Sequence, residues 1–172
     1  MRILMYRWKA YNQYDLIENL RERGHIVDEI KGELINYEED DGFSKRFNAR
    51  LDEVSYDMVI TINYFPLISD ICLERDILYV SWCCDCPIAT MYHESVFNKV
   101  NKIFCFDKIN YLTFADMGAL YITCRYVQLP KGLTDFFHRQ TIWTNMNLMF
   151  PLSEACTEKI LMMKYATISL IT

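Results

Sequence analysis

The fold is decided by residues 1–30, which read MRILMYRWKAYNQYDLIENLRERGHIVDEI. The apolar run Met1–Tyr6 has the composition of a buried strand. Apolar residues then recur at helical spacing within Tyr14–Arg23, and Gly24 stands where a helix C-cap glycine belongs. A second strand follows at His25–Ile30. This order predicts a β-α-β unit, the building block of a doubly wound sheet.

The same alternation continues along the chain. Further strands are predicted at residues 57–62, 77–81, 102–106 and 121–127, and helices at 43–54, with Asp41 as N-cap, 66–74 and 109–117. The expected fold class is α/β, a Rossmann-like three-layer sandwich with a mainly parallel sheet of about six strands. The alternation stops near residues 137–141. We therefore expect a single domain over residues 1–137 and an irregular tail over residues 138–172.

The composition excludes several classes of protein. Hydrophobic residues make up 52% of the chain and charged residues 24%, which is typical of a packed globular domain. The net charge of −5 provides no basic surface, so nucleic acid is not an expected partner. The sequence holds no uncharged apolar stretch long enough for a membrane span and no signal peptide. The seven cysteines are odd in number and lie mostly in apolar runs, which favours a reducing cytoplasm over a disulfide framework.

The residues after the predicted strands carry the functional information, because ligands of open α/β sheets bind at the carboxyl ends of the strands. The first strand is followed by Arg7–Ala10, without glycine, and no glycine-rich phosphate loop occurs among the five glycines of the chain. We therefore expect no dinucleotide or ATP cofactor. A phosphorylated receiver domain is also excluded, since Arg7-Trp8 and Asn63-Tyr64 stand where it needs acidic residues.

The densest cluster of chemically distinctive residues is SWCCDCP, at 81–87, after the fourth predicted strand. Cys83 and Cys86 form a CxxC pair, and Cys84 adds a third thiol. A structural zinc site needs a second pair of ligands, and no matching CxxC or CxxH follows. A thioredoxin-type CxxC opens a helix, whereas this pair adjoins the end of a strand. We predict no metal site and expect Cys83 and Cys84 to pack in the interior.

Asp85 is the candidate functional residue of this cluster. Its carboxylate follows a predicted strand, between Trp82 and Pro87, where it is placed to face a cleft. The alternative is a turn residue that binds backbone N–H groups. His93, on the next segment, is either a second polar group of the cleft or a surface histidine.

The order of these motifs resembles that of a known family. SWCCDCP at 81–87, IFCFD at 103–107, Gly118 and Leu129-Pro130 follow one another as in the amino-terminal domain of CgeB-like (spore-maturation type) bacterial glycosyltransferases, and the resemblance covers about residues 1–137. It implies a GT-B architecture, in which two Rossmann-like domains face a cleft. The first domain mainly holds the acceptor and the second holds the nucleotide-sugar, without a metal ion.

The resemblance also implies roles for particular residues. Asp85 is the candidate general base on the acceptor hydroxyl. The candidate substrate-binding residues of the cleft are Trp82, Pro87, His93, Asn63 and Lys131. The chain departs from the family at Cys86, where a small hydroxyl or acidic residue is usual, and at Lys131-Gly132, where a small apolar pair is usual.

A donor domain would need roughly 150 further residues. We therefore expect a chain that binds nucleotide-sugar only together with a second domain, is inactive alone and self-associates through the face meant for that domain. The sequence does not specify the acceptor. The alternative is a non-catalytic α/β ligand-binding or protein-interaction domain derived from such an enzyme.

Overall fold

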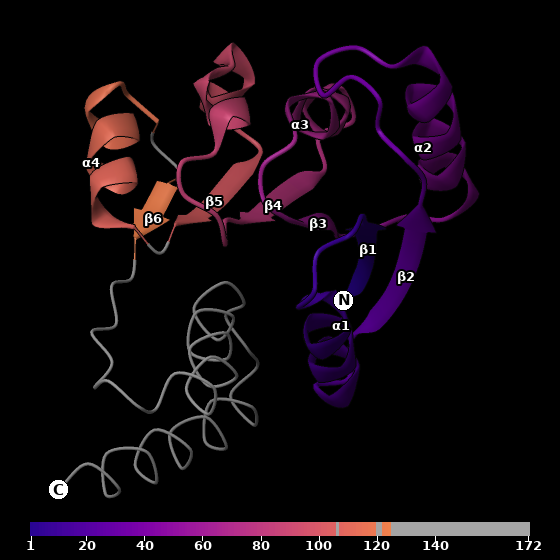
Figure 1. Ribbon diagram of the computed structural model, residues 1–172. Coiled ribbons are helices and arrows are strands. Elements are labelled where there is room, and N and C mark those ends of the chain that lie inside the picture. The colour runs from indigo at the N-terminus through magenta and orange to yellow at the C-terminus, as the bar shows by residue number, and fades with distance from the viewer. Residues whose placement is uncertain (106, 120–121, 125–172) are drawn as a thin grey trace, which may run out of the picture. The chain divides into compact units, whose positions relative to one another are not determined.

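The computed structural model describes residues 1–105, 107–119 and 122–124, all within one compact unit. In chain order the elements are β1 (Arg2–Arg7), α1 (Gln13–Glu22), β2 (Ile26–Lys31), α2 (Asp41–Glu53), β3 (Met58–Ile62), α3 (Pro66–Glu74), β4 (Leu78–Trp82), the 3₁₀ turns η1 (Ala89–Tyr92) and η2 (Glu94–Phe97), β5 (Asn101–Cys105), α4 (Lys108–Asp116) and β6 (Ile122–Cys124). Figure 1 shows the helices on both faces of the sheet.

The six strands form one sheet in the order β2-β1-β3-β4-β5-β6, and every neighbouring pair is parallel. All five residues of β3 are buried, as expected for a central strand of a parallel sheet whose apolar side chains pack on both faces. The predicted α/β class, with a mainly parallel sheet of about six strands, is confirmed.

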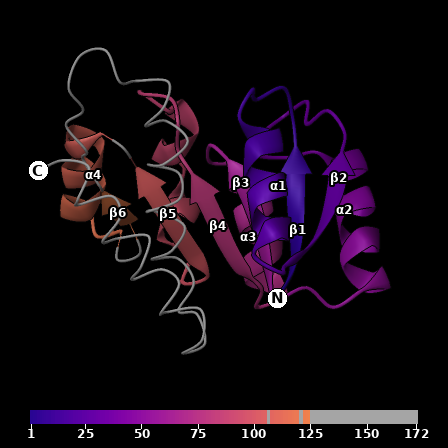
Figure 2. The same cartoon turned by 90° about the horizontal axis from the view of Figure 1, so that it is seen from below.

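The strand order changes direction between β1 and β3. The chain leaves β1 through α1 to reach β2 on one side, then crosses back to β3 on the other side of β1. Because right-handed crossovers in opposite directions lie on opposite faces of a sheet, α1 lies on one face and α2 and α3 on the other (Figures 1 and 2). Such a reversal leaves room at the carboxyl ends of the strands, where ligands bind in open α/β sheets.

Two details differ from the sequence prediction. The N-cap of α2 is Asp40 rather than Asp41, since the Asp40 carboxylate accepts a hydrogen bond of 2.8 Å from the backbone N of Phe43. Asp41 is already the first helical residue. The turns η1 and η2 were not predicted, because runs of a single turn have no periodicity to detect. The predicted domain boundary near residue 137, Lys131 and the tail over residues 138–172 lie outside the described residues.

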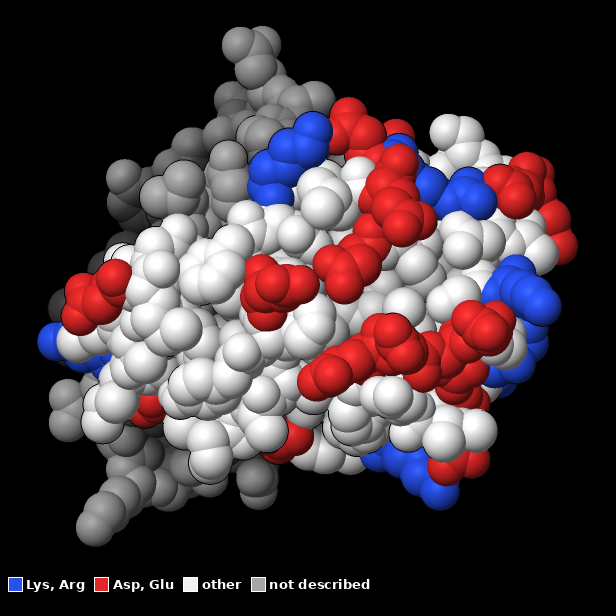
Figure 3. Space-filling model, turned by 90° about the horizontal axis from the view of Figure 1, so that it is seen from above, with Lys and Arg blue, Asp and Glu red and all other residues white. Residues whose placement is uncertain are grey.

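Charge is distributed unevenly over the face that carries α2, α3 and α4. Figure 3 shows Asp and Glu side chains gathered toward α2 and α3, and a surface with few charges toward α4. The large apolar side chains that are exposed on η1, η2 and around α4 are Tyr92, Phe97, Ile109, Leu112 and Met117. Self-association stays a prediction. No helix in the described part of the chain is long and apolar enough to cross a membrane.

Candidate functional site

The candidate site is built around a contact between the ends of β3 and β4. Asn63 follows β3, and its Nδ2 donates a hydrogen bond of 2.5 Å to the Oδ2 atom of Asp85, which follows β4. The Oδ1 atom of Asn63 accepts from the backbone N of Cys84 at 2.9 Å and of Asp85 at 3.4 Å. The structure therefore brings together two of the residues that the sequence singled out, Asn63 and Asp85.

The backbone of Asn63 is itself fixed. Its φ of +63° lies in the left-handed region, which asparagine tolerates better than most residues. Its N–H donates to the carbonyl oxygen of Trp82 at 2.8 Å, and its own carbonyl oxygen accepts from the Thr61 hydroxyl at 2.6 Å. Asn63 is buried whereas Asp85 is exposed. A rigid, buried amide thus holds one oxygen of a solvent-exposed carboxylate.

Three asparagine side chains from three parts of the fold hold the tripeptide Cys84–Cys86. Asn12, at the start of α1, donates to the Sγ atom of Cys84 at 3.1 Å. Asn110, in α4, donates to the Sγ atom of Cys86, also at 3.1 Å. Asn63 donates to Asp85, which lies between the two cysteines. Amide nitrogens thus fix this loop at each of its three residues. The Cys86–Pro87 peptide bond that follows is cis.

The cysteines of this cluster differ in their surroundings. Cys83 lies in the core, where it packs beside Met91 and behaves as a small apolar residue. Cys84 is half-buried, and burial raises the pKa of its thiol to about 11, so it stays protonated at neutral pH. Cys86 is exposed. Among the described residues, no group of His, Cys, Asp and Glu side chains is arranged to hold a metal ion.

The loop between β1 and α1 completes the site. The indole N–H of Trp8 donates to the carbonyl oxygen of Ile62 at 2.8 Å and ties this loop to the end of β3. The amide nitrogen of Gln13 donates to the carbonyl oxygens of Trp8 and of Ala10 within the loop. Sequence reasoning missed Asn12 and Gln13, although their position after the first strand and at the start of a helix was a usable signal.

The other predicted site residues are placed differently. Trp82 is the last residue of β4 and only 8% of its surface is exposed, so it offers little area for a ligand. Pro87 is exposed beside Asp85. His93 serves as the N-cap of η2, where its Nδ1 atom lies 3.1 Å from the backbone N of Ser95 and 2.9 Å from its hydroxyl. Lys131 lies outside the described residues.

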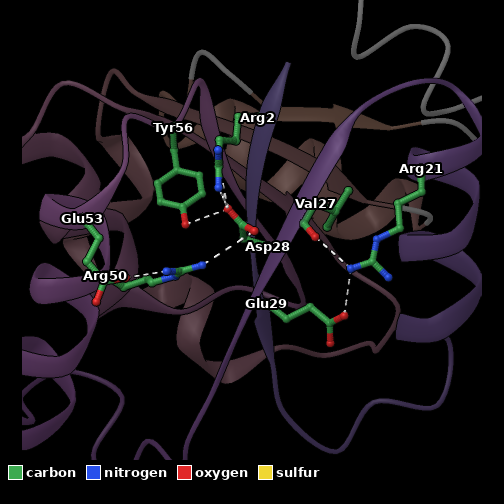
Figure 4. Close-up of polar contacts among 8 residues, drawn as sticks. All are labelled: Arg2, Arg21, Val27, Asp28, Glu29, Arg50, Glu53 and Tyr56. Carbon is green, nitrogen blue, oxygen red and sulfur yellow. Dashed lines mark hydrogen bonds and ion pairs between the residues drawn. The ribbon is translucent and has the colours of Figure 1, made fainter.

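A second polar cluster surrounds β2 and consists of paired charges (Figure 4). Asp28 contacts Arg2 at 2.8 Å and accepts a hydrogen bond of 3.0 Å from the Tyr56 hydroxyl. Its neighbour Glu29 lies on the other face of the strand and pairs with Arg7 at 2.6 Å. The hydrogen bond from Arg7 holds the pKa of Glu29 below its usual value. These acids are neutralised by arginines, so this cluster stabilises the fold rather than offering a free reactive group.

The contrast between the two clusters identifies what the site near β4 can do. Asp85 has no arginine or lysine partner among the residues that the structure describes, and its hydrogen bonds there are with Asn63. An exposed carboxylate held by a neutral amide can accept a hydrogen bond or a proton from a ligand hydroxyl. The fold is a doubly wound α/β domain, and Asn63 and Asp85 mark a candidate site at the carboxyl ends of its strands. Comparisons with protein-family models, with curated proteins and with solved structures gave no match.

Proposed function

We propose that this domain is the acceptor-side half of a GT-B-type glycosyltransferase, with Asp85 as the general base. The observation that carries the proposal is the exposed Asp85 carboxylate, which Asn63 holds at the carboxyl ends of β3 and β4, one strand away from the reversal of the strand order. The proposal is supported by the position of this fixed, exposed carboxylate at the strand ends, where a bound hydroxyl could donate its proton to it. The order of motifs that resembles CgeB-like enzymes agrees with this role.

In the proposed reaction, the acceptor hydroxyl loses its proton to Asp85 as its oxygen attacks the anomeric carbon of a nucleotide-sugar. A new glycosidic C–O bond forms, and the bond between the anomeric carbon and the phosphate oxygen breaks. The nucleoside diphosphate leaves with the bonding electrons. The nucleotide-sugar is held by a second domain, where helix N-termini and basic side chains stabilise the phosphates.

The test is an assay of nucleotide-sugar turnover. The chain is purified alone and together with the protein encoded directly downstream, and release of nucleotide from UDP-, GDP- and TDP-sugars is followed by mass spectrometry. We expect release only in the combined sample, and a fall of about 100-fold or more with Asp85→Asn. Asp116→Asn, which changes an exposed carboxylate at the end of α4, is the matched control and keeps the activity.

If neither sample releases nucleotide while both proteins are folded, the catalytic proposal is wrong. A chain that then still binds a small ligand is the alternative, a non-catalytic ligand-binding domain with the same edge.

A further inference from the structure

The amino end of α1 is the part of the site that the proposed chemistry at Asp85 does not use. The first backbone bond inside this helix runs from the N of Leu16 to the carbonyl oxygen of Asn12, at 3.3 Å. The N–H groups of Gln13, Tyr14 and Asp15 therefore have no partner within the helix. The Asn12 side chain, in the N-cap position, makes no capping hydrogen bond to them.

Buried, unpartnered oxygens lie at the same helix end. The side chains of Asn12 and Gln13 are 3% and 1% exposed, and their amide oxygens, Oδ1 and Oε1, have no hydrogen-bond partner among the described residues. The Asn12 amide is directed toward the site, since its Nδ2 contacts Cys84 next to Asp85. A buried acceptor without a partner is unfavourable. The helix end thus combines backbone donors with a buried acceptor that a ligand donor would satisfy.

The charges at this helix end disfavour an anion. Asp15 lies in the first turn and already complements the positive end of the helix dipole. Of the two cations nearest in sequence before this helix, Lys9 is exposed in the loop, and Arg7 is paired with Glu29 at 2.6 Å, with its guanidinium 4.2 Å from the centre of the Tyr14 ring. Asp85 adds another negative charge on the loop that Asn12 contacts. Inorganic phosphate keeps a P–OH hydrogen at neutral pH, so it is its negative charge that disfavours its binding here, whereas an uncharged hydroxyl group donates and accepts without that repulsion.

Two aromatic side chains flank the same residues. Tyr11 and Tyr14 are 76% and 62% exposed, directly before and after the Asn12–Gln13 pair. An exposed aromatic ring provides an apolar surface for the C–H face of a sugar ring, while polar groups of the same site bind the sugar's hydroxyls.

We propose that the amino end of α1, with Asn12 and Tyr14, binds an uncharged carbohydrate through its hydroxyl groups and does not bind phosphate. The inference rests on the proposed function only in naming this carbohydrate as the acceptor. Because the Asn12 oxygen is enclosed in the free chain, binding includes a local opening of the loop between β1 and α1.

The experiment is an NMR titration of the full, isotope-labelled chain. The probes are the methyl glycosides of glucose, mannose, galactose and N-acetylglucosamine, and inorganic phosphate in a parallel series. We expect at least one glycoside to shift the backbone amide signals of Gln13, Tyr14 and Asp15 at millimolar concentration, and phosphate to leave them unchanged. Shifts with phosphate but not with a glycoside overturn the proposal, and so does the absence of shifts with every probe.

Variants separate this proposal from the catalytic one. Tyr14→Ala is expected to lower the affinity for the glycoside by about fivefold or more, because the aromatic ring is lost. Tyr14→Phe keeps the ring and is expected to retain the affinity. Equal affinity in the two variants overturns the role of Tyr14. Asp85→Asn keeps the glycoside shifts at the helix end but loses transfer in the turnover assay. Carbohydrate binding without turnover therefore contradicts only the catalytic function, and turnover without these shifts contradicts only this site.

Discussion

Asn63 Nδ2 lies 2.5 Å from Asp85 Oδ2 and joins the carboxyl ends of two neighbouring parallel strands. The contact is directional, because the other end of the same amide accepts the backbone N–H groups of Cys84 and Asp85. A single side chain therefore fixes both the loop and the carboxylate on it. Replacing Asn63 tests the loop and the carboxylate together.

Asn63→Gly and Asn63→Ala separate the hydrogen bonds of Asn63 from its backbone conformation. Both variants remove the amide and leave the Cys84 N–H without its partner, and each is expected to lose about 1–3 kcal/mol of unfolding free energy. Alanine is expected to lose about 1 kcal/mol more than glycine, since the φ of +63° strains any residue with a Cβ atom. Urea unfolding measures both values. Equal stability of the two variants would show that the left-handed conformation is not maintained.

Asp40→Ala is expected to destabilise the chain by about 1 kcal/mol, because the N-cap of α2 is lost. The Asp40 carboxylate accepts from the backbone N of Phe43 at 2.8 Å and from that of Ile35 at 3.1 Å. Asp41→Ala is the matched control and changes the stability by a few tenths of a kcal/mol at most. Thermal or urea unfolding distinguishes the two. If Asp41→Ala destabilised the chain more than Asp40→Ala, Asp41 would be the N-cap of α2, as the sequence alone indicated.

Stability is expected to fall in acid through the charge cluster around β2. Partial burial opposes ionisation of Asp28, but the hydrogen bonds from Arg2 and Tyr56 outweigh it and hold the pKa of this carboxyl below its usual value. The pKa of Glu29 is lowered by Arg7. Carboxyls with a lower pKa in the folded chain bind fewer protons than in the unfolded chain. Their stabilisation is complete above the unfolded pKa of about 4 and is lost as the pH falls further.

The measurement for this cluster is the free energy of unfolding as a function of pH. Asp28→Asn and Glu29→Gln are each expected to flatten its decrease between about pH 5 and pH 2. Asp52→Asn, which breaks an exposed pair with Arg75, serves as the control and leaves the slope nearly unchanged. An unaltered slope in the two β2 variants would contradict the proposed linkage.

Among the cysteines whose surroundings the structure describes, Cys86 is expected to react first with a thiol reagent at pH 8. It is exposed, whereas Cys72, Cys83 and Cys105 are buried, and burial raises the pKa of the Cys84 thiol to about 11. Because the thiolate is the reactive form, Cys84 reacts slowly even where it is accessible. Cys86→Ser is expected to lower the number of thiols that react in the fast kinetic phase by one per chain. Cys83→Ser is expected to leave this number unchanged. A fast phase of undiminished amplitude in Cys86→Ser would contradict the exposure of this thiol.

The fold was largely predictable because it depends on periodicity. The apolar runs that form β1 and β3 and the helical spacing of Leu16, Ile17 and Leu20 in α1 report burial directly. Gly24, with a φ of +82°, ends α1 as predicted. The sequence does not show whether Asp40 or Asp41 is the cap, because either carboxylate suits the N-cap position. The backbone conformation before the helix determines which of them occupies it.

The candidate site was predicted in part. The rule that ligands bind at strand ends led to Asn63 and Asp85, and the structure joins them. It did not lead to Asn12 or Asn110, because the sequence does not show which distant loop will lie beside Cys84 and Cys86. His93 illustrates the opposite case, since a polar residue near a strand end serves to cap η2.

The charges on β2 have a consequence for the outer edge of the sheet. β2 is a terminal strand, and its free backbone groups would accept a strand from another molecule. Asp28 and Glu29 project to opposite faces and are held there by arginines from β1 and from the flanking helices (Figure 4). A strand that added at this edge would place its own side chains beside fixed charges on both faces. The cluster that stabilises the folded chain is therefore also expected to disfavour growth into a continuous intermolecular sheet.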